Sequence, residues 1–262
     1  MLDISLSIAL AIVTLTCFTT YPYYEKRFPL IYGYEKLSLK SVFFLALLIA
    51  VGVAFLAYMP KLAMKLLILA VLSILLYLYA YVLTNGKKLL SIALPALFIA
   101  CFLAIWNVWM LNIFASVIAI ALASILAFLF TWRITLLFTT LLVVLDIFHV
   151  FVTEMMTAAA VKMIKMGLPT LIAIPTYPTE GWIFLGLGDL LLASLLSIQT
   201  AKRFGRRYGF ASIALTTLSF LALENAIFNL GFHFFPATSM IVVGWGFLLL
   251  FLKLRGEDIL RG

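Results

Sequence analysis

Three carboxylic acids lie inside long apolar runs of this 262-residue sequence: Asp146, Asp189 and Glu224. Placing an ionisable side chain inside a bilayer costs at least about 2.5 kcal/mol on insertion scales, so each of these acids is a candidate functional residue. Two carboxyl groups that face one another in a low dielectric tend to share one proton. Such a pair can serve as general base and general acid in a hydrolytic reaction.

Asp146 and Asp189 occupy matching positions in two successive apolar runs. Asp146 lies seven residues before the end of the run 132–153, and Asp189 lies seven residues after the start of the run 182–200. At a rise of 1.5 Å per residue, antiparallel helices would place both carboxyl groups about 10 Å from the same membrane face. The spacing therefore predicts a facing pair. One acid would take a proton from water while the other polarises a carbonyl, without metal, nucleotide or covalent nucleophile.

The composition requires these acids to be positioned by membrane helices. Hydrophobic residues make up 66% of the chain and charged residues 11%, whereas soluble domains carry about 25% charged residues. We therefore expect an all-α polytopic membrane protein forming a single transmembrane domain over residues 1–262. Apolar segments close to the length that crosses a bilayer predict nine spans: 2–20, 41–59, 62–83, 89–105, 107–129, 132–153, 182–200, 209–230 and 234–252. Merging of the segments at the tight turns near Trp106-Asn107 or Trp132-Arg133 would give seven or eight instead.

The basic residues predict the orientation of the chain. With nine spans, fourteen of the 18 Lys and Arg residues fall on one side of the membrane. The positive-inside rule then places the N-terminus outside and the C-terminus in the cytoplasm. The formal charge of +8 lies in short loops that would face anionic headgroups, so we expect no nucleic-acid partner. Cys17 and Cys101 lie inside apolar runs and predict neither a disulfide nor a metal site.

The longest segment between predicted spans is 154–181. Lys162 and Lys165 share one side of an otherwise apolar stretch, which predicts a short interfacial helix. The β-prone run 168–175 follows and is bracketed by prolines. It predicts an extended segment that could add a strand to a bound partner. The alternative is an ordered loop without that role.

The residues before Asp189 favour close approach of another chain. Asp189 ends the tetrapeptide Gly186-Leu187-Gly188-Asp189. Glycine at two positions beside the acid allows a neighbouring helix and a substrate backbone to come near. A G-x-G pattern alone is weak evidence in a membrane helix, but a second aspartate at matching depth makes it stronger.

Three short motifs resemble those of the presenilin and signal peptide peptidase group of intramembrane aspartyl proteases, in its compact microbial form. They are Leu145-Asp146, Gly186-Leu187-Gly188-Asp189 and Pro236-Ala237-Thr238. The nine-span organisation, with the acids in the sixth and seventh spans, also resembles that group. Two positions depart from its pattern, because Leu145 stands where a tyrosine is usual and Thr238 replaces the leucine of the P-A-L motif.

The resemblance implies hydrolysis of peptide bonds within transmembrane helices of membrane proteins or signal peptides. Asp146 and Asp189 would be catalytic, and Gly186 and Gly188 would support the dyad. The segment 154–181 would gate the substrate. The residues expected to position the substrate are Leu187, Pro236, Ala237 and Thr238. No cofactor or metal is implied, the partners are helical peptides and the bilayer, and the compact chain suggests that no accessory subunit is required. With the N-terminus outside, preferred substrates would have a cytoplasmic N-terminus.

Other functions remain open on the sequence. A proton- or cation-coupled transporter could use the same acids together with His149 and Glu224, although no inverted pair of halves is evident. A prepilin peptidase also uses a G-x-G-D aspartate, and a membrane scaffold could bind single helices in the same groove. For His149 we favour a packing role over tuning of the dyad, and for Glu224 we favour pairing within the bundle. Neither H-E-x-x-H nor G-x-S-x-G occurs.

Overall fold

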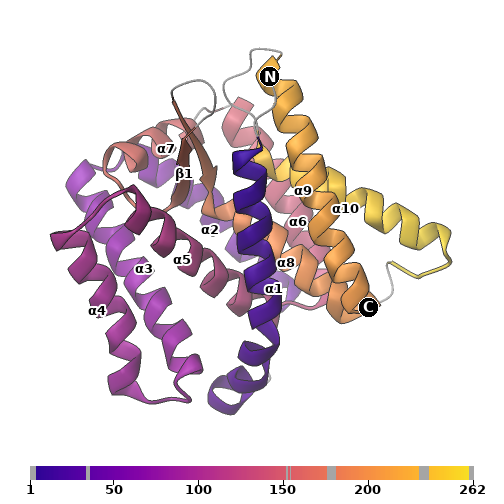
Figure 1. Ribbon diagram of the computed structural model, residues 1–262, viewed down its shortest axis with the longest axis horizontal. Helices are drawn as coiled ribbons and strands as arrows, with labels where there is room; N and C mark the ends of the chain where they lie inside the picture. Colours follow the sequence, from indigo (N-terminus) through magenta and orange to yellow (C-terminus); the bar gives the residue numbers. More distant parts are fainter. Residues whose placement is uncertain are drawn as a thin grey trace.

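The computed structural model describes residues 4–33, 36–151, 153, 155–175, 181–229 and 236–259. These residues form ten helices and one two-stranded sheet (Figure 1). In chain order the elements are α1 (Ser5–Tyr32), α2 (Leu39–Tyr58), α3 (Lys61–Leu83), α4 (Lys88–Ala104), α5 (Val108–Leu129), α6 (Trp132–Phe151), α7 (Met155–Lys165), β1 (Leu171–Pro175), β2 (Trp182–Gly186), α8 (Leu187–Phe204), α9 (Arg206–Asn229) and α10 (Ala237–Leu254).

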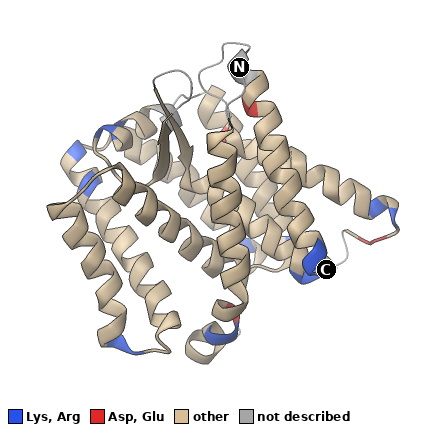
Figure 2. Ribbon diagram, in the orientation of Figure 1, with Lys and Arg blue, Asp and Glu red and all other residues tan. Residues whose placement is uncertain are grey.

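Seven of the described helices are long and apolar enough to cross a membrane. The chain is therefore a predominantly helical, polytopic integral membrane protein. Figure 2 agrees with this conclusion, because its Lys and Arg residues gather at helix ends and in connections. The seven are α1, α2, α3, α5, α6, α9 and α10.

The predicted number of nine spans is not supported. Each predicted segment overlaps a helix, but α4 and α8 are not among the seven. The α4 helix has only 17 residues. The α8 helix has 18 residues but includes Asp189, Gln199, Lys202 and Arg203, which lower its hydropathy. Counting apolar runs in the sequence therefore predicted more membrane spans than the lengths and compositions of the helices support.

The first helix is longer than predicted. We expected Tyr21-Pro22 to end it, but α1 continues through Pro22 and Pro29 to Tyr32. A proline inside a helix removes one backbone hydrogen bond, and membrane helices tolerate this where neighbouring groups compensate. Gly33, with φ of 80°, then ends the helix and donates its N–H to the Pro29 carbonyl.

An antiparallel hairpin fills part of the segment between α6 and α8. The predicted short helix is present as α7, and part of the predicted extended run forms β1. Leu171 pairs with Gly186 and Ala173 with Phe184 in the sheet register. Residues 154 and 176–180, which belong to the predicted gating segment, lie outside the described residues.

The second strand corrects the predicted start of the seventh span. Residues 182–186, assigned from the sequence to a helix, form β2, and α8 begins at Leu187. Asp189 therefore lies in the first turn of its helix, not seven residues into it. A short apolar run fits a buried strand as well as a helix, which is why hydropathy alone misassigned it.

The α8 helix lies at the centre of the bundle, in contact with α1, α5, α6, α9 and α10. Every residue from Leu190 to Thr200 is buried. The side chains of Ser197, Gln199 and Thr200 in this stretch are paired across helices. The Gln199 side-chain amide donates to the carbonyls of Ala127 (2.9 Å) and Phe130 (3.1 Å). These bonds satisfy polar groups that would otherwise be costly to bury.

Candidate active site

Asp146 lies on α6 and is buried, with 7% of its surface exposed. The hydroxyl of Thr238 donates to its Oδ2 at 2.5 Å. Its Oδ1 atom is also buried and has no hydrogen-bond partner among the described residues. One oxygen of this carboxyl group is therefore fixed by the protein, while the other remains able to bind a further donor.

Thr238 is the second residue of α10, after Pro236 at the N-cap and Ala237 at the first helical position. Pro236 has no N–H to leave unpaired, and its fixed φ suits the approach to a helix. The Pro236 carbonyl accepts hydrogen bonds from the Ser239 N–H (3.1 Å) and hydroxyl (2.6 Å). The first turn of α10 thus points its positive end toward Asp146, which favours a negative charge there.

Asp189 lies in the first turn of α8 and is partly buried. The Gly186 backbone N–H interacts with its carboxyl group. A Cβ atom added at Gly186 would lie only 3.1 Å from Asp189 Oδ2, which is tighter than ordinary van der Waals contact. Glycine at this position therefore leaves the room that the carboxyl group occupies. Apart from its chain neighbours and its own helix backbone, no atom of the described residues lies within 4 Å of a Cβ added at Gly188, so these residues leave the space beside this glycine open.

The structure brings Asp146 and Asp189 together. The helices that carry them, α6 and α8, are in contact, and α10 contacts both. The two carboxyl groups are close enough to interact electrostatically. Leu187, between the two glycines, donates its N–H to the Thr170 carbonyl at 3.1 Å. Of the residues predicted to position a substrate, Thr238 bonds Asp146 directly and Leu187 begins the helix that carries Asp189.

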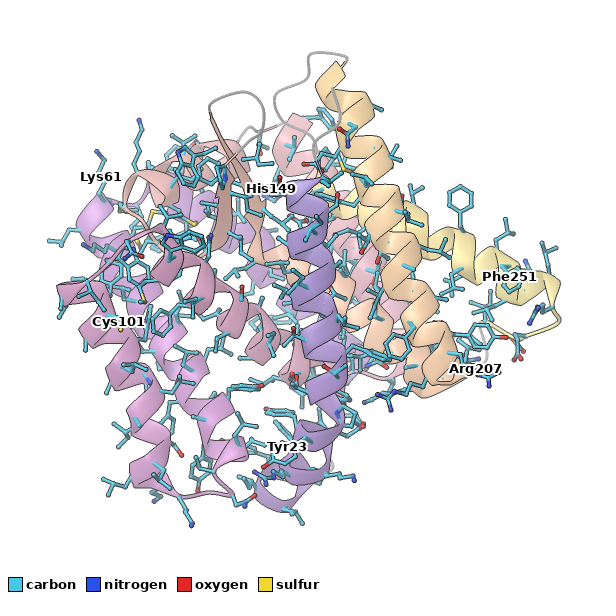
Figure 3. The ribbon with its side chains drawn as sticks, in the orientation of Figure 1. Tyr23, Lys61, Cys101, His149, Arg207 and Phe251 are labelled. Atoms are coloured by element: carbon cyan, nitrogen blue, oxygen red, sulfur yellow. The ribbon has the colours of Figure 1, made fainter. Side chains whose placement is uncertain are left out.

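His149 and Glu224 are both buried. The His149 ring is bound through Nδ1 to the Leu145 carbonyl of its own helix at 2.8 Å, and it interacts electrostatically with Asp146. In Figure 3 its label lies toward the same end of the bundle as Lys61, whereas Tyr23 and Arg207 lie toward the opposite end. Ser7 donates to Glu224 Oε2 at 3.4 Å, so Glu224 links α9 to α1. This contact agrees with the structural role favoured for Glu224.

Two residues of this region were missed in the sequence. The Trp106 indole N–H donates to the Gly167 carbonyl at 2.7 Å. The Asn112 side chain bonds both backbone groups of Ala173. The sequence signal that could have identified Asn112 is its side-chain amide inside the otherwise apolar run of α5. Thr238 was predicted to position the substrate, but its direct bond to Asp146 was not anticipated.

Among the described residues, no group of three or more His, Cys, Asp or Glu side chains could hold a metal ion. What the site offers is a pair of interacting carboxyl groups, a hydroxyl donor and a helix N-terminus, which are the elements of acid–base chemistry on a neutral substrate.

Comparison with known proteins identifies no family. No family model matches the sequence, and no curated protein matches it.

Proposed function

We propose that this chain is an aspartic endopeptidase that cleaves peptide bonds within transmembrane helices, similar to the presenilin and signal peptide peptidase group. The observation that carries the proposal is the geometry of Asp146. Its Oδ2 is held by Thr238, while its buried Oδ1 has no hydrogen-bond partner among the described residues, and the carboxyl group interacts with Asp189. A packing role would leave no reason for two interacting acids at this place, because each costs free energy to bury.

The reaction uses one proton shared between the two acids. A hydroxyl donor stabilises an ionised carboxylate, so we assign the role of general base to Asp146. Its ionised carboxylate takes a proton from water, whose oxygen attacks the scissile carbonyl. Protonated Asp189 meanwhile donates a hydrogen bond to that carbonyl oxygen. As the C–N bond breaks, a proton passes to the leaving amine, and both acids return to their starting states.

The hairpin next to the dyad supports a way of holding the substrate. The side chains of Trp182 and Phe184 on β2 are exposed by 52% and 40%. Their backbone polar groups have no hydrogen-bond partner among the described residues on the side away from β1. An unwound segment of a substrate helix would pair with this edge as an added strand. Because β2 leads directly into α8, the paired segment would lie beside Asp189.

The proposal includes nine crossings. The α4 and α8 helices would be about 26 and 27 Å long at 1.5 Å per residue, close to the thickness of the hydrocarbon core. Protein neighbours surround α8 from Leu190 to Thr200, so the polar residues of this stretch would not meet lipid. With nine crossings, the distribution of basic residues places the N-terminus outside and the C-terminus in the cytoplasm. Substrates with a cytoplasmic N-terminus would then be preferred.

The test is a cleavage assay with the purified chain in detergent and a single-span helical peptide, with products identified by mass spectrometry. We expect cleavage inside the helix by the wild type. Asp146→Asn and Asp189→Asn should each lower the rate by at least about a thousandfold, as loss of a catalytic group does. Asparagine keeps the shape of the side chain but cannot carry the shared proton.

The same variants distinguish the other candidate functions. Glu224→Gln removes a buried acid outside the dyad and should leave cleavage nearly unchanged. Equal products from the wild type and both aspartate variants would overturn the dyad. If no helix were cleaved but proton uptake into liposomes depended on all three acids, the chain would be a transporter instead.

A further inference from the structure

Two side chains near the start of α5 hold the segment that leads into the hairpin. The Trp106 indole N–H donates to the Gly167 carbonyl, and the Asn112 amide bonds Ala173, in each case across 61 residues of sequence. The Asn112 contacts are a matched pair. Its Nδ2 donates to the Ala173 carbonyl at 2.8 Å, and its Oδ1 accepts from the Ala173 N–H at 2.8 Å.

The sheet register explains why Ala173 needs partners outside the hairpin. Leu187 donates to Thr170 across the hairpin, and hydrogen-bonded and non-bonded pairs alternate along an antiparallel ladder. Ala173 and its opposite residue Phe184 therefore form a non-bonded pair. The polar backbone groups of Ala173 point away from β2 toward α5, and those of Phe184 point the other way.

Asn112 does for Ala173 what a residue of a third strand would do. A single side chain satisfies both the N–H and the C=O of one strand residue, which is the pairing that a neighbouring strand provides. The α5 helix also packs on β1, because Leu111, Leu171 and Ala173 form one buried cluster. The outer edge of β1 is thus closed at its centre. The open edge of the hairpin is that of β2.

A continuous series of contacts connects Asn112 to the dyad. Asn112 bonds Ala173 on β1, and β1 pairs with β2. The last residue of β2, Gly186, interacts with the carboxyl group of Asp189. Each link is a backbone hydrogen bond or a direct contact, so a shift of β1 along α5 would be passed to the strand next to the dyad.

We propose that Asn112 is a positioning residue that sets the register of the hairpin and thereby selects which substrate bond lies at the dyad. The inference rests on the proposed protease function and deepens it. Asn112 touches neither the substrate nor the carboxyl groups. It fixes β1 on α5, so that a substrate strand added to β2 meets Asp146 and Asp189 at one position only.

The experiment compares the full chain with Asn112→Leu, Asn112→Asp and Ser116→Ala in detergent. Leucine keeps the size of the side chain but removes both bonds, whereas aspartate keeps only the acceptor for the Ala173 N–H. The control residue Ser116 lies one turn further along α5, and its hydroxyl bonds the carbonyl of its own helix at Asn112. Two measurements are made: hydrogen exchange of the Ala173 amide, and the distribution of cleavage products of a single-span helical peptide.

In Asn112→Leu we expect exchange at Ala173 to accelerate by at least about tenfold. The principal cleavage site should lose about half of its share to neighbouring bonds, because small misplacements at a reacting centre have large effects. Asn112→Asp should give a smaller change in both measurements, and Ser116→Ala should give none. General loss of structure would lower every product in proportion and would leave the distribution unchanged.

Three results would overturn the inference. Unchanged exchange at Ala173 in Asn112→Leu would show that the amide does not hold β1. Faster exchange at Ala173 with an unchanged product distribution and an undiminished total yield would show that the anchor does not set the cleavage position. A broadened distribution in Ser116→Ala would assign the effect to α5 in general. Failure of the proposed function itself looks different, because the wild type would then give no products while the exchange result would still stand.

Discussion

The peripheral helix α3 and the central helix α8 differ in both hydropathy and burial. The α3 helix is strongly apolar and buries a narrow stripe at Met64, Ile68, Leu72 and Leu76, while large hydrophobic residues on its other side remain exposed. The α8 helix is less apolar and is buried on every side from Leu190 to Thr200. Of these two helices, the more apolar one thus faces outward and the more polar one lies in the core.

The difference in burial between α3 and α8 arises because lipid, not water, surrounds the bundle. Lipid chains solvate an outward leucine as well as a protein neighbour does, so the exposed face of α3 needs no partner. A polar atom inside the bundle cannot hydrogen-bond to water. Each buried polar atom on α8 therefore needs a hydrogen-bond partner in the protein. Changes in α8 and the helices that pack on it should therefore be costly, and matched changes at the periphery should be nearly silent.

The largest contrast is expected between two glycines. A Cβ atom at Gly244 on α10 would lie 2.3 Å from the Leu215 carbonyl oxygen on α9, whereas one at Gly52 on α2 would meet nothing within 4 Å. Gly244→Ala should lower the free energy of unfolding by about 3 kcal/mol, because overpacking forces backbone shifts. Gly52→Ala should be neutral or slightly stabilising. Unfolding titrations in detergent would measure both, and equal shifts would contradict the packing described for α9 and α10.

A second contrast concerns two threonine hydroxyls. Thr238→Val removes the donor to Asp146 and should lower kcat about thirtyfold, as for a hydrogen bond to a charged group. KM should hardly change, because this hydroxyl bonds the carboxyl group. Thr238→Ser should restore most of the rate. Thr16→Val removes an exposed hydroxyl that bonds the Ile12 carbonyl of its own helix, and it should leave kinetics unchanged. A rise in KM without a fall in kcat would point to substrate contact by Thr238.

The open edge of the hairpin gives a third prediction. Phe184→Pro removes the N–H that points away from β1 and should lower kcat/KM about tenfold, through one lost backbone bond and a poorer fit of the substrate strand. The fold should tolerate proline here, since the ladder to β1 does not use this N–H. Steady-state kinetics and a thermal midpoint would be compared. Unchanged kinetics would mean that the substrate does not pair with β2.

The smallest effect is expected for two tryptophans. Trp245 is buried, and its indole N–H donates to the Thr200 hydroxyl on α8 at 2.9 Å. Trp245→Phe should lower the free energy of unfolding by about 1 kcal/mol, the usual net contribution of one hydrogen bond. Trp109 is 77% exposed at the start of α5, so Trp109→Phe should change stability within error. A larger loss of stability in Trp109→Phe than in Trp245→Phe would contradict the expectation that buried positions are the more sensitive ones.

The helices could be predicted from the sequence better than the hairpin could. The apolar runs are long enough to separate helix from strand, and each predicted segment overlaps a helix. The exception is 182–186, where five apolar residues suit a strand or a helix equally. The placement of Asp189 in a first turn was missed for that reason. The proximity of Asp146 and Asp189 was nevertheless anticipated, because both acids flank the same connection between successive segments.

The contacts that fix the site could not be read from the sequence. Asn112 and Ala173 are 61 residues apart, and nothing in either local pattern identifies the other as its partner. Thr238 was expected to position the substrate, not to bond a catalytic acid. Its bond to Asp146 depends on where the start of α10 lies relative to α6, which is a property of the tertiary fold.

The central position of α8 has a consequence for how the protein is made. A segment with Asp189, Lys202 and Arg203 partitions poorly into lipid by itself. In the proposed arrangement of nine crossings, its entry into the bilayer would therefore depend on helices synthesised earlier. Of its neighbours, α1, α5 and α6 precede it in the chain, whereas α9 and α10 follow. The earlier helices would therefore remain incompletely packed at the insertion machinery until α8 has been synthesised. We expect chains arrested before α9 to hold α8 only loosely, and quality-control proteases to recognise them.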